Sequence, residues 1–406
     1  MALGLACGRR TGISPSDHDG GDAGQSPSGL AGHGGGATDA GAIAGAPAPD
    51  ANLADALPLD VSVESGGPDA SSAPDVNDAP APSGIWTNRT RGTLASGQGW
   101  AAVTSDVAGQ RLVAVSGTLS RPGNLVSGIW ISTSGGATWA HVGGADAYGS
   151  VASNSTGSVY VVAGYLGLDE PILTSINAGA TWSSTDRPQY AGPVASDASG
   201  ANLVAVAYDG AIWTSPNSGE TWIDRTPPGP TWRWLAVASS TSGARLVALS
   251  GGASSPTCAA PGDIWTSDDF GAHWIDRTPT GAAHGACWTS VASDASGMNL
   301  VAVGSGIWTS TDAGVTWTRR FVSPDGSSEP FLWSSVASDA RGNRLIASVG
   351  WLGGPGDLWT SANGGASWTN ETAGTPAALQ DWRGVASDAA GVHLVAVVSD
   401  GDIWTN

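Results

Sequence analysis

Six short segments of this sequence place a side-chain oxygen five residues before a tryptophan. Such oxygens could bind a cation or accept hydrogen bonds within a turn. The clearest segment is Ser310–Trp317, which reads S-x-D-x-G-x-T-W. The six acceptor positions are held by Ser134, Asn177, Asn217, Asp269, Asp312 and Asn363. Only two of them are carboxylates, whereas a calcium or magnesium site needs charged oxygen ligands. A short acceptor close to Gly is typical of a turn that bonds its own backbone amides. We therefore predict structural turns, and neither a metal nor another cofactor.

This eight-residue motif is the Asp-box, the signature of BNR-type repeats. The chain therefore resembles the β-propellers of sialidase-like enzymes, sortilin-type receptors and photosystem assembly factors. The resemblance covers about residues 84–406 and implies an architecture, but it does not name a ligand or a reaction.

The elements that carry these motifs recur at intervals of 43 to 54 residues, which suits four-stranded propeller blades. Each repeat opens on a valine and then offers three further strand-like segments. In one repeat the second segment, Leu300–Val303, is apolar at every position, as expected when both faces are covered. The opening valines are Val103, Val151, Val194, Val237, Val291, Val336 and Val385. We predict an all-β, seven-bladed β-propeller over residues 84–406.

The two ends of the repeat region complement each other. The last repeat stops at Ile403–Asn406, where a fourth strand is missing, and Ile85–Thr90 matches the fourth strand of the sixth repeat at Trp368–Thr372. We expect the N-terminal segment to complete blade seven, which closes the ring and removes unpaired edges.

The first 83 residues differ in composition from the repeats. Met1–Cys7 resembles the end of a bacterial lipoprotein signal, with Gly4 as a departure from that pattern, and this implies lipidation of Cys7. The alternative is an ordinary cytosolic N-terminus. Residues 8–83 are rich in Gly, Ala, Pro and Asp and lack a hydrophobic period, which predicts a disordered acidic tether. Together they predict an exported protein of the cell envelope or outer surface, with membrane contact only through the lipid anchor.

Charge excludes one class of partner. The chain has 35 acidic residues against 16 basic ones, and all the basic ones are arginine. Binding to a phosphate backbone needs a basic surface, so nucleic acid is not an expected partner. No run of 18 apolar residues is present, so no transmembrane helix is expected.

Loop length separates the two rims of the expected propeller. The turns after the first and third strands of each blade are nearly uniform, whereas insertions fall in the connections on the opposite rim. Variation on a rigid scaffold concentrates where binding happens. We therefore expect a protein or glycan partner there. The candidate binding residues are Trp351, Trp232, Tyr165, Arg121 and Arg233; loop tryptophans can instead simply cover the core. The insertions are 117–127, 164–170, 250–262, 322–331 and 350–356.

Aromatic residues at the start of the first strand recur in most repeats. They are Trp100, Tyr148, Trp234, Trp288, Trp333 and Trp382. An aromatic ring at the channel mouth could stack on a ligand, but residues repeated in nearly every blade are more often packing, and we favour packing.

Two cysteines lie in loops of the insertion-bearing rim, Cys258 and Cys287. In an oxidising compartment they could form a disulfide, which leaves Cys7 as the odd cysteine. The alternative is two unrelated free thiols.

Catalysis has weak support in the residues. The resemblance to sialidases implies three arginines, a Tyr nucleophile and an Asp acid/base, but no Phe precedes an Arg, so the family's Phe-Arg-Ile-Pro segment is absent. A two-carboxylate glycoside hydrolase could use rim carboxylates, namely Asp169, Glu170, Asp325, Glu329, Asp381 and Asp400. We expect a non-catalytic binding or scaffold module; the alternatives are a glycoside hydrolase and a purely structural envelope protein.

Overall fold

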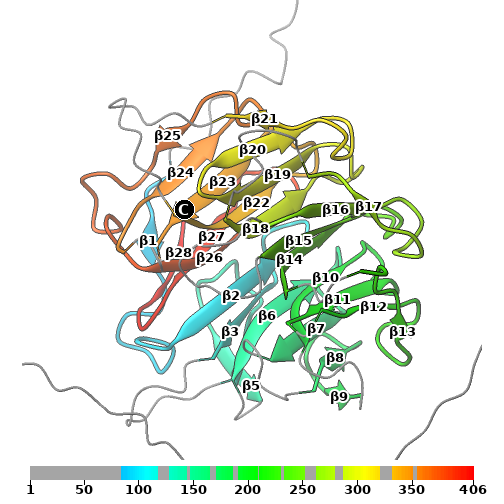
Figure 1. The fold of residues 1–406 in the computed structure, drawn as a ribbon. Coiled ribbons are helices and arrows are strands. Elements are labelled where there is room, and N and C mark those ends of the chain that lie inside the picture. The colour runs from blue at the N-terminus through cyan, green and yellow to red at the C-terminus, as the bar shows by residue number, and fades with distance from the viewer. Residues whose placement is uncertain are drawn as a thin grey trace, which may run out of the picture. The chain divides into compact units, whose positions relative to one another are not determined.

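The computed structural model describes residues 84–117, 128–143, 147–164, 171–185, 191–208, 210–229, 233–251, 262–278, 287–320, 332–350 and 354–406. These residues form seven four-stranded antiparallel sheets, arranged as the blades of a β-propeller (Figure 1). The predicted fold class is confirmed. The lipoprotein-like segment 1–7 and the acidic segment 8–83 lie outside the described residues.

In six blades the strands run from the innermost to the outermost in chain order, and in blade seven the outermost strand comes from the N-terminal end of the domain. The innermost strands are β2 (Trp100–Ser105), β6 (Tyr148–Ser153), β10 (Ala191–Ser196), β14 (Arg233–Ser239), β18 (Trp288–Ser293), β22 (Trp333–Ser338) and β26 (Trp382–Ser387). The second strands are β3 (Leu112–Ser116), β7 (Tyr160–Gly164), β11 (Leu203–Ala207), β15 (Leu246–Gly251), β19 (Leu300–Gly304), β23 (Leu345–Val349) and β27 (Leu394–Val398).

The third strands are β4 (Gly128–Ser132), β8 (Leu173–Ser175), β12 (Ile212–Ser215), β16 (Ile264–Ser267), β20 (Ile307–Ser310), β24 (Leu358–Ser361) and β28 (Ile403–Thr405). The outermost strands are β5 (Ala140–Gly143), β9 (Ser183–Ser184), β13 (Ile223–Asp224), β17 (Ile275–Asp276), β21 (Thr318–Arg319), β25 (Thr369–Asn370) and β1 (Thr87–Asn88). We call these four positions A, B, C and D.

The hydrophobic core is divided among the seams between blades. Each of the seven apolar clusters joins two neighbouring blades, and the last joins blade seven to blade one. In β3, Leu112 and Ala114 belong to the seam with blade seven, while Val113 and Val115 belong to the seam with blade two. Because side chains alternate between the two faces of a strand, a B strand must be apolar throughout to supply both seams.

A closed ring of backbone hydrogen bonds links the seven A–B turns. The amide of Val107 donates to the carbonyl of Ser155 in the next blade at 3.0 Å, and the series returns with Ala389 donating to Val107 at 3.1 Å. The intermediate residues are Ala198, Thr241, Ala295 and Ala340. Within every blade, the serine that ends strand A also donates its hydroxyl to the carbonyl of the following residue. Each seam is therefore fixed by both apolar packing and a backbone contact.

The N-terminal segment completes blade seven, as the sequence predicts. Strand β1 pairs antiparallel with β28, and Figure 1 shows them side by side although they come from opposite ends of the domain. The hydroxyl of Thr90 donates to Asp402 Oδ1 at 2.9 Å and accepts the amide of Ile403 at 3.0 Å. In blade six, Thr372 makes the same two contacts with Asp357 and Leu358. The match between the two D strands therefore extends to their hydrogen bonds.

None of the described segments is a long apolar helix of the kind that crosses a bilayer.

Closure through β1 predicts a large effect at a single hydroxyl. Thr90 is fully buried, so Thr90→Val leaves the amide of Ile403 and one oxygen of Asp402 without this partner. We expect a loss of about 1–3 kcal/mol in the free energy of unfolding, measured by chemical denaturation. The matched control is Thr87→Val in β1, just before Thr90, where the side chain is exposed and a change within about 0.5 kcal/mol is expected. Equal effects of the two substitutions would contradict closure through this strand.

Candidate functional site

The rim formed by the A–B and C–D turns is built from local hydrogen bonds. In each of the six C–D turns, the hydroxyl of the serine that ends strand C accepts the amide of the glycine four residues later, at 2.8–2.9 Å. The side chain two residues after that serine accepts a hydrogen bond from the backbone amide four residues further along the chain, as Asp312 does from Thr316 at 2.8 Å. The same contact is made by Ser134, Asn177, Asn217, Asp269 and Asn363. All six acceptors are therefore engaged with their own turns.

The backbone of these turns explains their glycines. The glycine of each turn has a positive φ, and so does the residue before it, which includes Ala178, Ser218, Phe270 and Ala313 at 56–60°. Two successive positive-φ residues strain a chain of L-amino acids, and glycine relieves this at one of them.

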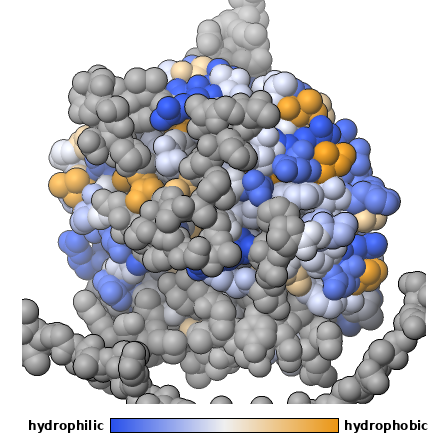
Figure 2. Space-filling model, viewed as in Figure 1, coloured by the Kyte–Doolittle hydropathy of each residue, from blue (hydrophilic) through white to orange (hydrophobic). Residues whose placement is uncertain are grey.

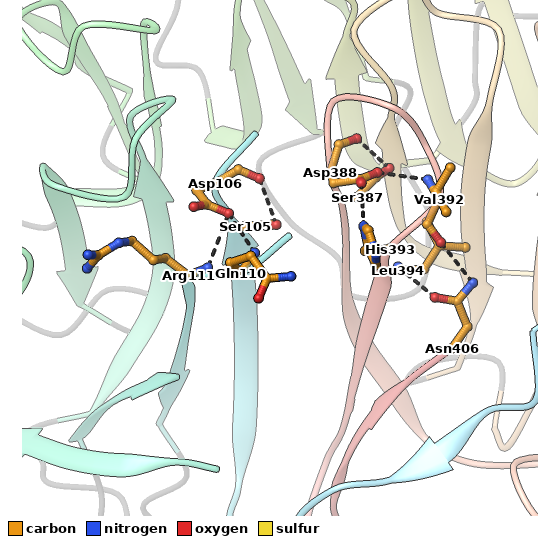
Figure 3. A network of polar contacts seen from close by, with 10 residues as sticks. All are labelled: Ser105, Asp106, Gln110, Arg111, Ser387, Asp388, Val392, His393, Leu394 and Asn406. Carbon is orange, nitrogen blue, oxygen red and sulfur yellow. Dashed lines mark hydrogen bonds and ion pairs between the residues drawn. The ribbon is translucent and has the colours of Figure 1, made fainter. Parts of the chain in front are cut away.

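Buried carboxylates line the centre of the same rim. Asp106 accepts the amides of Gln110 and Arg111, and Asp388 accepts the amide of Val392 and contacts His393 Nδ1 at 2.7 Å (Figure 3). Equivalent turns surround a recess of about 250 Å³ at the end of the channel. Because these carboxylates serve their own turns, they are turn residues, and the described residues contain no group of three His, Cys, Asp or Glu side chains that could hold a metal ion.

The opposite rim carries a feature that sequence reasoning missed. Every A strand shifts register against its B strand at its first residues, as between Trp234 and Ala236 in β14. A bulge of this kind re-aims the side chains on either side of it. One extra residue in each blade thereby lies at the channel mouth on the B–C and D–A rim, and these positions include Leu235, Thr289, Ser334 and Arg383.

The repeated aromatic residues at the start of strand A are packing residues. Their side chains are at most 2% exposed. Three of the indole N–H groups donate to glycine carbonyls: Trp234 to Gly210, Trp288 to Gly262 and Trp382 to Gly356. The bulge turns these rings into the seams, so they do not form an aromatic ring in the channel.

Arg233 is the predicted binding residue that the structure describes in atomic detail. Its guanidinium lies 4.0 Å from the centre of the Tyr208 ring, which follows strand B of the preceding blade. Its Nε is buried and has no hydrogen-bond partner among the described residues. A guanidinium stacked on an aromatic face is held in a fixed orientation, and its remaining N–H groups suit a carboxylate or carbonyl acceptor. Arg233 and Tyr208 thus form a built contact on the rim where binding is expected.

A second charged pair lies at the start of strand A in blade seven. Arg383 contacts Asp381 Oδ2 at 3.4 Å, and the carbonyl of Asp381 accepts the amide of Ser399. Asp381 is therefore engaged with an arginine rather than paired with a second carboxylate. Asp400, the other predicted rim carboxylate that the structure describes, lies in the B–C turn of the same blade with a positive φ of 51°.

The remaining predicted site residues fall outside the described residues. These are Trp351, Trp232, Tyr165, Arg121, Cys258 and Cys7, together with Asp169, Glu170, Asp325 and Glu329. Cys287 is described and is disulfide-bonded. Its pairing with Cys258 stays a prediction.

Tyrosines and histidines add no catalytic constellation among the described residues. Tyr148 and Tyr160 are buried in the seams, where desolvation raises the pKa of Tyr160 despite the opposing effect of Arg111. His141 packs on Trp130 with ring centres 5.1 Å apart, while His273 and His393 contact Asp269 and Asp388.

Comparison with solved structures identifies other propellers. The chain is similar to the GH74 xyloglucanase from Xanthomonas campestris, with 18% identity and a TM-score of 0.57 over 79% of this chain and 53% of that one. It thus spans about half the length of that enzyme. YCF48 from Cyanidioschyzon merolae matches with 14% identity and a TM-score of 0.56 over 79% of this chain and 98% of that one.

A structure of YCF48 bound to D1 peptide matches with 14% identity and a TM-score of 0.55 over 79% of this chain and 95% of that one. At these identities the likeness shows the fold alone. No protein-family model matches the sequence, and the search of curated proteins finds no significant match.

The turn at Asp269 predicts a pH-dependent contribution to stability. Burial raises the pKa of Asp269, but hydrogen bonds from His273 and Ser267 outweigh it and hold the pKa at about 2. A depressed carboxyl pKa stabilises the fold above the unfolded value of about 4, and this contribution is lost as the pH falls toward 2. Asp269→Asn keeps the turn acceptor, as Asn177 and Asn217 do, but not the charge. The wild-type protein and Asp269→Asn should therefore differ in the free energy of unfolding at pH 7. The difference should be no more than about 1 kcal/mol, because Asp269 and His273 form an exposed pair, and it should disappear as the pH falls from 4 to 2. Denaturant titrations at pH values between 7 and 2 measure this difference in unfolding free energy. A difference that does not change with pH would contradict the stabilising role of the Asp269 carboxylate.

The disulfide at Cys287 predicts a cross-linked peptide. Proteolysis of the unreduced protein should release one peptide pair joined through Cys287 and Cys258, detected by mass spectrometry and lost after reduction. The matched control is Cys7, which should remain outside this bond. Free thiols at both loop cysteines would contradict the pairing.

Proposed function

We propose that this protein is an exported, surface-tethered propeller that binds a protein segment without catalysis, through its B–C and D–A rim. The observation that carries the proposal is the contact of Arg233 with Tyr208, which holds an arginine on the rim that bears every long insertion. Arginine and aromatic side chains dominate the binding energy of many protein interfaces.

The geometry suits a peptide acceptor. The Nε of Arg233 is already removed from water and lacks a partner among the described residues, so part of the desolvation cost of binding is met before a partner arrives. A backbone carbonyl or a carboxylate on a protein segment would satisfy such an arginine through charge-assisted hydrogen bonds. Trp351, Trp232, Tyr165 and Arg121 belong to the same rim in the repeat register and are proposed to extend the contact.

Two further observations support parts of this proposal. The structure of YCF48 bound to D1 peptide is one case in which a propeller of this fold engages a peptide. The disulfide at Cys287 favours an oxidising compartment, because cytosolic thiols are kept reduced. Lipidation of Cys7 would then tether the propeller through residues 8–83.

A glycoside hydrolase is the alternative function. It is supported by the fold shared with a GH74 xyloglucanase and by rim carboxylates such as Asp381 and Asp400. The contact of Asp381 with Arg383 at 3.4 Å weighs against it, because a two-carboxylate mechanism needs a second carboxyl group and Asp381 is instead engaged by a guanidinium. Turnover of any of a panel of polysaccharides, abolished by Asp381→Asn or Asp400→Asn, would favour the hydrolase.

The binding role predicts a graded response at the stacked pair. We expect Arg233→Ala and Tyr208→Ala to lower capture of envelope proteins by the immobilised full-length chain about tenfold, whereas Tyr208→Phe, which keeps the ring, retains capture. Trp351→Ala and Trp232→Ala should also lower capture with little loss of thermal stability. Capture is quantified by mass spectrometry against Arg341→Ala as the matched control, since Arg341 is an exposed arginine in the A–B turn of blade six, on the opposite rim. Equal capture by all variants would move the binding site away from this rim.

A further inference from the structure

The seams next to blade four open as two equivalent grooves on the A–B and C–D rim, away from the proposed binding rim. One groove, of about 270 Å³, lies between blades three and four, and the other, of about 240 Å³, lies between blades four and five. They share Leu246 of β15 as a common wall, so they flank the same blade.

Each groove repeats the same pairing of an apolar side chain with an arginine. Strand D and the two residues after it read Ile-Asp-Arg-Thr in both blades, at Ile223–Thr226 and Ile275–Thr278. The isoleucine and the arginine line the groove, while the aspartate between them is not among its lining residues. Alternation along a strand explains this arrangement, because residues two apart share a face.

The apolar part of these grooves is exposed. Ile223 is 41% exposed and Phe270 47% in the first groove, and Ile275 is 47% exposed and Val315 56% in the second. Figure 2 shows hydrophobic residues in orange, set among hydrophilic ones, along the edge of the molecule that carries β13, β17 and β21 in Figure 1.

The arginines have no carboxylate partners. Neither Arg225 nor Arg277 forms an ion pair among the described residues, although the chain as a whole carries a net charge of −19. Arg225 donates only through Nε, to Thr214 at 3.3 Å, and the Nε of Arg277 is buried without a hydrogen-bond partner. Among the described lining residues, the second groove has one carboxylate, Asp268, beside Arg245 and Arg277, and the first has Arg225 and no carboxylate, so the described lining of each groove is net positive.

The seam between blades five and six provides an internal comparison. Its groove, of about 170 Å³, keeps an arginine at Arg320, which is bound to Thr309 at 2.7 Å. Thr318 replaces the isoleucine, and Asn363 and Gly364 form the turn side. Of these three grooves, in the part of the chain that the structure describes, the two beside blade four combine an exposed apolar wall with a half-buried arginine that has no ion pair.

We propose that these two grooves form a docking surface for an acidic peptide segment whose carboxylates alternate with apolar side chains. A carboxylate would pair with Arg225 or Arg277, and an apolar side chain beside it would cover Ile223 and Phe270 or Ile275 and Val315. Charge complementarity selects this occupant, because single arginines set in apolar walls match carboxylates spaced along a chain. A polyanion would instead meet the negative field of the remaining surface.

The test uses the full-length protein and a fluorescein-labelled, acetylated dodecapeptide with four Asp and four Leu separated by Ser and Gly, followed by fluorescence anisotropy. We expect saturable binding that Arg225→Gln and Arg277→Gln each weaken about tenfold and the double variant weakens further. The control peptide has Asn in place of every Asp and should bind at least tenfold more weakly. Arg91→Gln serves as the protein control and should leave binding unchanged.

The repeats supply substitutions that the fold tolerates. Glu371 occupies the position of Arg277 in blade six, and Thr318 occupies that of Ile275 in blade five. Ile223→Thr and Ile275→Thr should therefore fold and weaken binding through the apolar walls alone, with melting temperatures confirming the fold. Absence of saturation, equal binding of the Asn peptide, or wild-type affinity in both arginine variants would overturn the proposal. The variants at Arg233 should leave this binding unchanged, which separates this surface from the other rim.

Discussion

The hydrogen-bond ring that links the seven A–B turns is the constraint on which the rest of the structure depends. Each blade donates one amide to the next blade and accepts one from the preceding blade, so no turn can move outward without losing contacts at two seams. The apolar clusters between blades require the same spacing, since each is shared by two blades. Blade seven also needs a fourth strand to match the other six blades. The pairing of β1 with β28 provides this, and it makes the two ends of the domain structural partners.

The same constraint divides the two rims chemically. On the A–B and C–D rim, side-chain acceptors such as Asp106 and Asp312 are used to satisfy backbone amides of their own turns, and this leaves few of them for a ligand. On the other rim, every A strand has a bulge at its start, and in six of the seven blades a large aromatic residue at this point is buried in the seam. Arg233, at the start of such a strand, meets Tyr208 from the preceding blade there. The scaffold thus holds a partly desolvated arginine on the B–C and D–A rim, at the seam between blades three and four.

Arginine placement matters more than net charge in this acidic chain. Arg383 is paired with Asp381, whereas Arg233 is stacked on an aromatic ring, and Arg225 and Arg277 lie in apolar grooves with no carboxylate partner among the described residues. Guanidinium groups tolerate such surroundings because they are weakly hydrated and keep their charge. Local positive sites can therefore exist on a protein whose overall field repels polyanions, and they favour ligands with a few well-spaced acceptors.

The repeats in the sequence determined the blade number, the all-apolar B strands and the completion of blade seven by Ile85–Thr90, because each follows from a pattern within a single repeat or from a match between two repeats. The packing of the strand-A aromatics was also predictable, since they recur where every seam needs a large side chain. Other features needed the tertiary structure. The strand-A bulges depend on how one strand pairs with the next, and the Arg233–Tyr208 contact and the grooves beside blade four join residues of different blades. Repeat spacing fixes which strands are neighbours, but the twist and register between sheets decide which side chains meet across a seam.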